Sequence, residues 1–393
     1  MRTRSPRMRT RWPHRERTRA RTIRGLIRLD FATPVPILAR SSPPSRRRSL
    51  FGSPHLAQRP IRLGVIGVGV VAQVNHLPAL KSRRDVEVVA VCDDDVEKAR
   101  MVAQHFGIGR AVADYESLLR SDDIDAVIIA TPNHLHAPMT QAALGYGKHV
   151  LCEKPAARTA AEAAQMAVAA ERSGKVLMYA MNNRFRSDVS VLRGYLERKE
   201  LGKIFYVKTG WLLRRTERRG PGWYENKKSS GGGVLMDLGV QMLDLSLWLL
   251  GNPKVVSVTA SKYVTDPRKD VEDTVAAFLV LDGGASLTLE VSWALLLERN
   301  FPYLNLFGTD GAALLNPFRI HKELNGNLLN VTPPLESTKN IYKQSYEREL
   351  DHFLRCLTQG ERPMASAEEG HDLMQVIDAI YQSAEARREV RLH

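Results

Sequence analysis

The stretch Ile61-Arg62-Leu63-Gly64-Val65-Ile66-Gly67-Val68-Gly69-Val70-Val71-Ala72 predicts how the first half of the chain folds. Its apolar run, Ile61–Val68, is typical of a buried strand, and a helix over Val71–Ser82 is expected to follow. Between them Gly67 permits a tight turn, Gly69 lets another molecule approach the backbone, and Ala72 allows close helix–strand packing. Such a turn before a helix N-terminus is a binding site for a dinucleotide pyrophosphate. The alternative is a small-residue turn that binds nothing.

Strands and helices alternate from Ile61 to about Met181. The segment Ala126–Thr131 is continuously apolar, which is typical of a parallel sheet covered on both faces. This rhythm predicts a doubly wound α/β Rossmann domain with right-handed crossovers. The expected strands are Ile61–Val68, Val86–Cys92, Ala126–Thr131, His149–Cys152 and Val176–Ala180, and the expected helices are Val71–Ser82, Asp95–Phe106, Asp114–Arg120, Pro138–Gly145 and Thr159–Ser173.

The pattern changes after Arg184 and predicts an α+β domain with a mostly antiparallel sheet. Two glycine-containing turns, Asp282-Gly283-Gly284 and Thr309-Asp310-Gly311, are typical of hairpins. We therefore divide the chain into a leader (1–60), a dinucleotide-binding domain (61–182) and a second domain (183–393). The second domain is expected to hold strands at Ile204–Leu213, Val255–Tyr263, Thr274–Leu281, Ala285–Trp293, Tyr303–Gly308 and Ala312–Asn316, and helices at Leu192–Lys199, Val234–Leu250, Tyr346–Thr358 and Ala367–Arg387.

All of the excess positive charge lies in the leader. The chain has a net charge of +14, and residues 1–60 contain 16 Arg, no Lys and only two acidic residues, Glu16 and Asp30. The remaining residues carry equal numbers of basic and acidic side chains, so we expect no nucleic-acid partner for the body of the protein. The leader lacks apolar periodicity, and we predict that it is disordered. It is a targeting segment, a nucleic-acid-binding arm, or a translated stretch upstream of the true start.

Three cysteines, Cys92, Cys152 and Cys356, lie far apart in the chain. An odd number without metal-ligand spacing argues against a disulfide scaffold and against a structural metal site. No run of 18 or more apolar residues indicates a membrane span. A cytoplasmic protein without a bound metal is expected.

Acidic residues follow the second expected strand. Asp93 lies 26 residues after Gly67, where a carboxylate accepts hydrogen bonds from the adenosine ribose of NAD. Together with Asp94 it would repel the additional phosphate of NADP, so we predict NAD as the cofactor and regard NADP as less favoured. The alternative is a helix cap, since Asp93, Asp94 and Asp95 precede a helix.

Polar residues also follow the third and fourth strands of this domain. Thr131-Pro132-Asn133-His134-Leu135-His136 follows the third, and Cys152-Glu153-Lys154-Pro155 includes the end of the fourth. Ligands bind at the carboxyl ends of such strands, which places these segments at the nicotinamide end of the site. A partly desolvated Lys154 would have a lowered pKa and could relay a proton. Solvated loop histidines and a surface lysine are the alternatives.

The triplet Gly231-Gly232-Gly233 precedes an apolar helix that carries Asp237, Gln241 and Asp244 on one stripe. Polar groups on a buried helix must find partners, because each unsatisfied group costs about 1–3 kcal/mol. The stripe is either a wall facing the substrate or a buried structural network.

In combination these motifs resemble the glucose–fructose oxidoreductase / inositol dehydrogenase / rhizopine-catabolism (Gfo/Idh/MocA) superfamily. The resemblance covers roughly Ile61 to Tyr381 and includes Glu153-Lys154-Pro155 and Asn183-Arg184-Phe185. It implies a second domain with an open-faced sheet, assembly into homodimers or homotetramers through that sheet, and a sugar, inositol or related polyol as substrate. One position departs from the family, which usually has a histidine where this chain has Gln241.

The motifs and the resemblance together assign roles to particular residues. Lys154 would be the general acid/base or polarise the substrate, while Asp237 and Gln241 would orient hydroxyl groups. Because a glutamine amide does not exchange protons near neutral pH, Lys154, Asp237 or His136 would take the substrate proton. The substrate pocket would comprise Lys154, Arg184, Trp223, Asp237 and Gln241. The cofactor would contact Gly67, Val68, Gly69, Val70, Val71, Ala72, Asp93, Asp94, Thr131, Pro132, Asn133, His136, Glu153, Lys154 and Arg184.

The leading functional hypothesis is an NAD(P)-dependent oxidoreductase that moves a hydride to or from a hydroxyl or carbonyl of a sugar, sugar derivative or cyclitol. In a second hypothesis the protein retains and recycles its NAD during sugar elimination or hydrolysis. A third, suggested by Gln241, is a non-catalytic sensor that binds NAD(H).

Overall fold

A computed structural model describes residues 59–215, 222–335 and 340–392. All of these belong to one unit, Phe51–His393. The predictions for the leader lie outside the described residues, except at positions 59 and 60.

The first layer is a six-stranded parallel sheet, which confirms the predicted Rossmann domain. Its strand order, β3-β2-β1-β4-β5-β6, is that of a dinucleotide-binding fold. The strands are β1 (Ile61–Ile66), β2 (Val86–Cys92), β3 (Arg110–Val112), β4 (Ala126–Ile129), β5 (His149–Glu153) and β6 (Leu177–Ala180). The three-residue strand β3 was not predicted, because so short a segment has no readable periodicity.

Helices cover both faces of this sheet. They are α1 (Leu77–Lys81), α2 (Val96–Phe106), α3 (Tyr115–Leu119), α4 (Asn133–Gly145) and α5 (Ala160–Ser173). Helix α4 was expected to begin at Pro138 but begins at Asn133, with Pro138 inside it. A proline is favoured in a first helical turn, and this preference misplaced the predicted start. The segment predicted as a loop after the third strand is therefore the first turn of α4.

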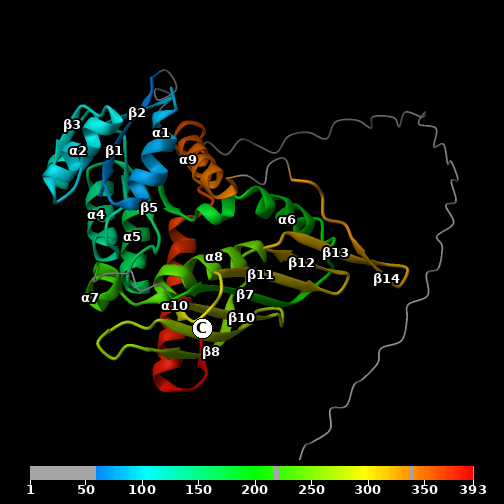
Figure 1. The fold of residues 1–393 in the computed structure, drawn as a ribbon. Coiled ribbons are helices and arrows are strands. Elements are labelled where there is room, and N and C mark those ends of the chain that lie inside the picture. The colour runs from blue at the N-terminus through cyan, green and yellow to red at the C-terminus, as the bar shows by residue number, and fades with distance from the viewer. Residues whose placement is uncertain (1–58, 216–221, 336–339, 393) are drawn as a thin grey trace, which may run out of the picture. The chain divides into compact units, whose positions relative to one another are not determined.

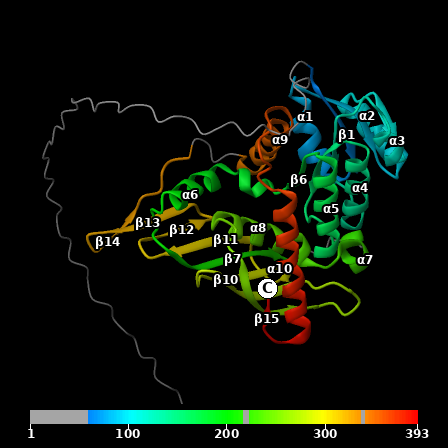
Figure 2. The same cartoon turned by 180° about the vertical axis from the view of Figure 1, so that it is seen from behind.

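A late helix joins this layer. In both views α9 (Ile341–Gln359), drawn in orange, lies beside the blue α1 (Figures 1 and 2). Its side chains Leu350 and Phe353 share an apolar cluster with Leu63 and Val65 of β1. Burial of these side chains stabilises the packing of residues that are almost 300 positions apart in the chain.

The second layer is a nine-stranded sheet in the order β14-β13-β12-β11-β7-β10-β9-β8-β15. It is mostly antiparallel, as predicted, although β7 and β10 pair in parallel. Its strands are β7 (Ile204–Arg214), β8 (Val255–Tyr263), β9 (Thr274–Leu281), β10 (Ser286–Leu295), β11 (Phe301–Gly308), β12 (Gly311–Leu315), β13 (Arg319–Leu324), β14 (Asn327–Asn330) and β15 (Val390–Arg391). The last three were not predicted; β14 is exposed along its length and shows no alternation of buried residues.

Helices pack against one face of this sheet. They are α6 (Ser187–Glu197), α8 (Val240–Leu249) and α10 (Ala367–Ala386), whereas the short helix α7 (Lys227–Ser230) packs against α4. Val207, Leu287 and Leu289 point into the resulting core and are fully buried. The segment Lys227–Leu249 is long and apolar enough to cross a membrane by composition alone, but 94% of its apolar window is buried inside the protein. It therefore fits a core helix.

Candidate active site

A large cavity runs along the carboxyl ends of β1, β2, β4 and β5. Its volume is about 1030 Å³, enough for a dinucleotide and a small substrate. The first domain contributes the glycine turn and the segments that follow β2, β4 and β5. The second domain contributes Trp223, Tyr224, Ser230, Gly232, Gly233, Met236, Asp237 and Trp293.

The glycine turn fits a bound pyrophosphate. Gly67 has φ +87°, and a Cβ there would lie 2.5 Å from the carbonyl oxygen of Ala130, so the turn requires glycine at this position. A Cβ on Gly69 would have no atom within 4 Å, so this backbone faces open space. Ala72 is fully buried against the strand, as predicted. Gly67, Gly69, Val70 and Val71 line the cavity.

The sequence left two roles open for the three aspartates after β2, ribose binding and helix capping, and different aspartates are placed for each. Asp95 is the helix cap, since its side chain accepts a hydrogen bond from the Lys98 amide at 3.0 Å. Asp93 accepts one from the Val68 amide at 2.9 Å and thereby fixes the glycine turn. Both Asp93 and Asp94 line the cavity, where the adenosine ribose would bind.

The first turn of α4 links the two layers. The Asn133 side chain is 6% exposed and donates a hydrogen bond to the Ser230 carbonyl at 2.8 Å. Thr131, Pro132 and Asn133 line the cavity, in agreement with the predicted position. His134 lines it too, although the sequence reasoning assigned it no role.

His136 lies behind the cavity wall. It is fully buried, with Nδ1 2.8 Å from the Pro155 carbonyl oxygen and Nε2 3.0 Å from that of Thr131. Burial lowers its pKa, despite these two carbonyls. The imidazole thus joins the segments after β4 and β5. This arrangement argues against the expectation that His136 takes the substrate proton.

Lys154 meets Asp237 at the junction of the two layers. Its Nζ lies 3.0 Å from both the carboxylate Oδ1 and the backbone oxygen of Asp237. The expected lowering of the Lys154 pKa is wrong: burial does lower it, but the Asp237 carboxylate and nearby Glu153 outweigh burial, and the pKa lies above its ordinary value. The raised pKa means that the Lys154 ammonium is charged. Its side chain is 21% exposed and lines the cavity, so the ammonium is accessible from there.

Glu153 supports the lysine from the opposite side. Its Oε1 lies 2.8 Å from His76 Nε2, and Oε2 accepts a hydrogen bond from the Lys154 amide at 3.2 Å. Burial raises the pKa of Glu153, but the hydrogen bond and charge of His76 and the charge of the Lys154 ammonium lower it by more. The pKa therefore lies below its ordinary value, and the carboxyl is ionised. This carboxylate adds negative potential where the Lys154 ammonium lies.

Gln241 and Arg184 do not lie where they were expected. Gln241 is 7% exposed; its Nε2 donates to the Asp237 carbonyl at 3.1 Å and its Oε1 accepts from Asn183 at 3.2 Å. Arg184 is 4% exposed and forms two hydrogen bonds with Asp244, at 2.8 and 2.6 Å, and one with Glu369 at 2.6 Å. Neither is among the described residues that line the cavity. Of the predicted stripe, only Asp237 faces it.

Glu272 positions the helix that carries Asp237, a role that sequence reasoning missed. Its buried carboxylate accepts hydrogen bonds from the amides of Gly233 (2.9 Å) and Leu235 (3.1 Å) and from the Tyr381 hydroxyl (2.9 Å). A Cβ on Gly233 would lie 1.8 Å from the Glu272 carbonyl oxygen, so only glycine fits. No local sequence signal connects Glu272 to a turn almost 40 residues away.

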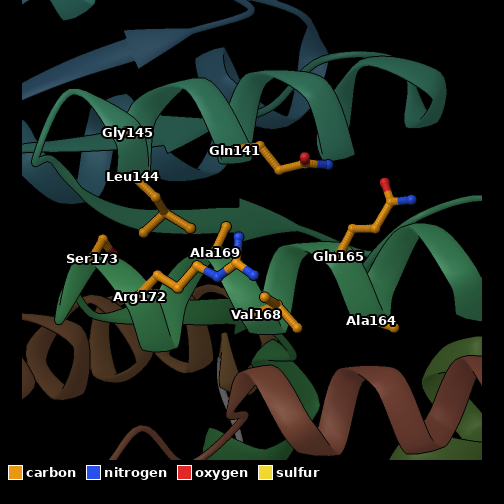
Figure 3. A pocket seen from close by; sticks show the side chains of 9 residues that line it. All are labelled: Gln141, Leu144, Gly145, Ala164, Gln165, Val168, Ala169, Arg172 and Ser173. Carbon is orange, nitrogen blue, oxygen red and sulfur yellow. The ribbon is translucent and has the colours of Figure 1, made fainter.

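A second hollow, of about 610 Å³, lies between α4 and α5 (Figure 3). Gln141 and Leu144 on α4 face Gln165, Val168 and Arg172 on α5. The hollow reaches the C-terminal ends of both helices, at the sheet edge opposite the glycine turn. Only one charged side chain, Arg172, lies in its lining. We assign no chemistry to it.

Comparison with known proteins identifies the family. Residues 61–181 match the NAD-binding Rossmann domain of the Gfo/Idh/MocA oxidoreductases, and residues 193–392 match the C-terminal α/β domain of the same family. D-glucoside 3-dehydrogenase of Escherichia coli (strain K12) is 34% identical over 353 residues, spanning 86% of this chain and 99% of that enzyme. D-xylose 1-dehydrogenase (NADP(+)) 2 of Haloferax volcanii is 33% identical, spanning 84% of this chain and 98% of its own length.

A solved structure agrees with the fold. Levoglucosan dehydrogenase in complex with NADH superimposes with a TM-score of 0.79 at 24% identity, covering 85% of this chain and all of that one. The chain therefore belongs to the Gfo/Idh/MocA oxidoreductase family, and it is an NAD(P)-dependent oxidoreductase.

Proposed function

We propose that the protein interconverts a secondary hydroxyl and a carbonyl on a neutral sugar, sugar derivative or cyclitol, with Lys154 as the proton-transferring residue. The observation that supports this most strongly is the Lys154–Asp237 pair at 3.0 Å inside the cavity. The nicotinamide supplies or accepts the hydride when bound. The chain must hold the substrate and move the proton.

The charge state of Lys154 suits carbonyl reduction. A charged ammonium hydrogen-bonds a carbonyl oxygen and donates a proton as negative charge develops there. In the direction of alcohol oxidation Lys154 must first lose its proton, and its raised pKa places that loss at alkaline pH. The oxidation rate is thus expected to rise with pH through the alkaline range.

The second domain supplies an aromatic wall for the substrate. Trp223, Tyr224 and Trp293 line the cavity on the side of Asp237. Trp223 is 42% exposed, which leaves its surface available for contact. Aromatic faces pack against the C–H groups of a sugar ring while polar groups at the edge fix its hydroxyls. Asp237 is the residue that we assign to orient a substrate hydroxyl.

A panel of sugars and cyclitols, assayed with purified protein and NAD, tests this function. Net formation of NADH, followed by its absorbance, is the expected result for at least one sugar. Product formed without net NADH would instead support the retained-cofactor reaction. NADH binding with no turnover of any sugar in either direction would support the sensor hypothesis.

We further propose that the uncovered face of the second sheet assembles two copies of this chain. Phe278 on this face is 44% exposed, and the half-buried rings of Tyr206 on β7 and Phe307 on β11 stack with centroids 5.7 Å apart. Exposed aromatic groups of this kind are typical of subunit interfaces. Light scattering of the purified protein is expected to give a dimer or tetramer, and Phe278→Glu is expected to shift it toward monomer.

A cytoplasmic location completes the proposal. It is supported by the three cysteines, which are all buried and free. Cell fractionation with an antibody to the protein tests it.

A further inference from the structure

The adenosine end of the cavity contains a positive charge that the sequence reasoning overlooked. Lys98 lies in α2, and its Nζ is 2.7 Å from Asp93 Oδ1. The Lys98 side chain is 37% exposed, whereas that of Asp93 is 7% exposed. Lys98 lines the cavity together with Asp93, Asp94 and Tyr115. The cation therefore stands on the cavity side of the buried carboxylate.

Most of the acceptor capacity of Asp93 is already used inside the protein. A carboxylate has roughly four acceptor positions. At Asp93, Oδ2 accepts from the Val68 amide at 2.9 Å, while Oδ1 accepts from the Asp95 amide at 3.2 Å and pairs with Lys98. One position remains on Oδ2. Asp93 can thus bind one ribose hydroxyl without displacing any present partner.

The ion pair also changes the electrostatic argument against NADP. Burial raises the pKa of Asp93, but Lys98 and the amides of Val68 and Asp95 outweigh it, and the carboxyl stays ionised. Its negative charge is balanced at short range by the Lys98 ammonium. The remaining carboxylate, Asp94, is exposed and accepts a hydrogen bond from the Asp95 amide at 3.0 Å. The site therefore repels the additional phosphate of NADP less strongly than Asp93 and Asp94 would without Lys98.

We propose that Lys98 lets the site bind NADP as well as NAD: its ammonium stays beside Asp93 and donates its remaining N–H groups to the 2′-phosphate of NADP. A lysine has a long flexible stem and a point charge with three donors, which suits a phosphate. With NAD bound, Lys98 remains on Asp93, and the free position on Asp93 takes a ribose hydroxyl. This inference concerns the cofactor alone and stands whichever sugar is the substrate.

Binding measurements on the full chain test the proposal without any turnover. The Kd values of NADH and NADPH are measured by titration calorimetry for the wild type, Lys98→Met, Lys98→Arg and the control Lys203→Met, which removes an exposed lysine of the second domain. For the wild type, the NADPH Kd is expected within about tenfold of the NADH Kd. In Lys98→Met it is expected to rise about 10- to 100-fold, with the NADH Kd changed less than about threefold. Lys98→Arg keeps both cofactors.

Two results would overturn the proposal. One is a wild-type protein that binds NADH but shows no NADPH binding at millimolar concentration. The other is a Lys98→Met variant in which both Kd values rise equally, which would mean that Lys98 acts only by holding Asp93 and the glycine turn. If Lys98→Met does not fold, the same two Kd values are measured for Lys98→Gln, and the salt dependence of both wild-type Kd values is measured as a second test of the proposal. The NADPH Kd is expected to depend more steeply on salt, and equal slopes would contradict the role of Lys98.

Discussion

The two glycine turns that line the cavity, at Gly67–Gly69 and at Gly231–Gly233, have similar local structures but different roles. Each is followed by a π-helical segment, Ala72–His76 in the first domain and Leu235–Gly239 in the second. Each is held by a carboxylate that accepts a backbone amide of the turn, Asp93 in one case and Glu272 in the other. The first turn faces open space at Gly69, whereas the second is filled by its own chain at Gly233.

This difference shows how one local motif either binds a ligand or positions a side chain. Open space beside Gly69 leaves backbone amides for a pyrophosphate. At the other turn Glu272 and Tyr381 occupy that place, and the helix start is fixed so that Asp237 meets Lys154. π-Helical segments are frequent at functional sites. Here Val71, which precedes the first segment, and Met236, within the second, line the cavity.

The largest effect is expected at the filled turn. Gly233→Ala would bring a Cβ within 1.8 Å of the Glu272 carbonyl oxygen, so the backbone must shift. We expect the free energy of unfolding to fall by about 3 kcal/mol or more, measured by urea denaturation. A variant as stable as the wild type would show that the turn is not tightly packed.

Glu272→Gln is expected to have the next largest effect. The amide loses the charge that attracts two backbone N–H groups and presents its own donors to them. Stability should fall by about 1.5–3 kcal/mol, and kcat should fall at least tenfold while the Kd of NADH stays unchanged. Asp282→Asn, at an exposed hairpin carboxylate, serves as the control. An unchanged kcat would contradict the positioning role of Glu272.

At the open turn the effect should appear in binding rather than in folding. Gly69→Ala adds a Cβ where no atom lies within 4 Å, so stability should change by less than about 0.5 kcal/mol. The Kd of NADH should rise about tenfold or more, since the methyl group occupies the space of the pyrophosphate. Unchanged NADH binding would mean that the cofactor does not approach this turn.

A third buried carboxylate, unlike Asp93 and Glu272, accepts no hydrogen bond from a backbone amide in the part of the chain that the structure describes. Glu349 is fully buried, and neither oxygen has a hydrogen-bond partner among the described residues. Burial, with Glu153 and Asp244 nearby, raises its pKa well above the ordinary value. The folded protein then holds a proton that the unfolded chain releases above about pH 4.5, so stability falls as pH rises from there.

Glu349→Gln removes this dependence. The variant should be more stable than the wild type at pH 8, with a smaller difference at each lower pH, and equally stable at pH 4, by thermal or urea unfolding. The opposite order at pH 8 would show that the Glu349 carboxylate is ionised and stabilising in the folded protein.

Much of the fold was predictable because its signals are local. Apolar strands, small-residue turns and helix caps indicated the Rossmann domain and placed Lys154 at a sheet edge. The start of α4, the strands after Leu315 and the docking of α9 depend on tertiary packing that no local pattern reveals. Lys154 and Asp237 were recognised by their motifs, although 83 positions separate them. For Gln241 the buried network that the sequence left open as an alternative is the one found. The buried position of Arg184 was not foreseen, because its partners Asp244 and Glu369 come from other elements.

Single-turnover hydride transfer in Lys154→Met tests the central claim most directly. On a sugar turned over by the wild type, the rate constant should fall about a thousandfold or more, while the Kd of NADH, measured on the same sample, should stay within about threefold. Lys203→Met is the matched control and should match the wild type. A Lys154→Met rate within tenfold of the wild type would contradict the assignment of proton transfer to Lys154.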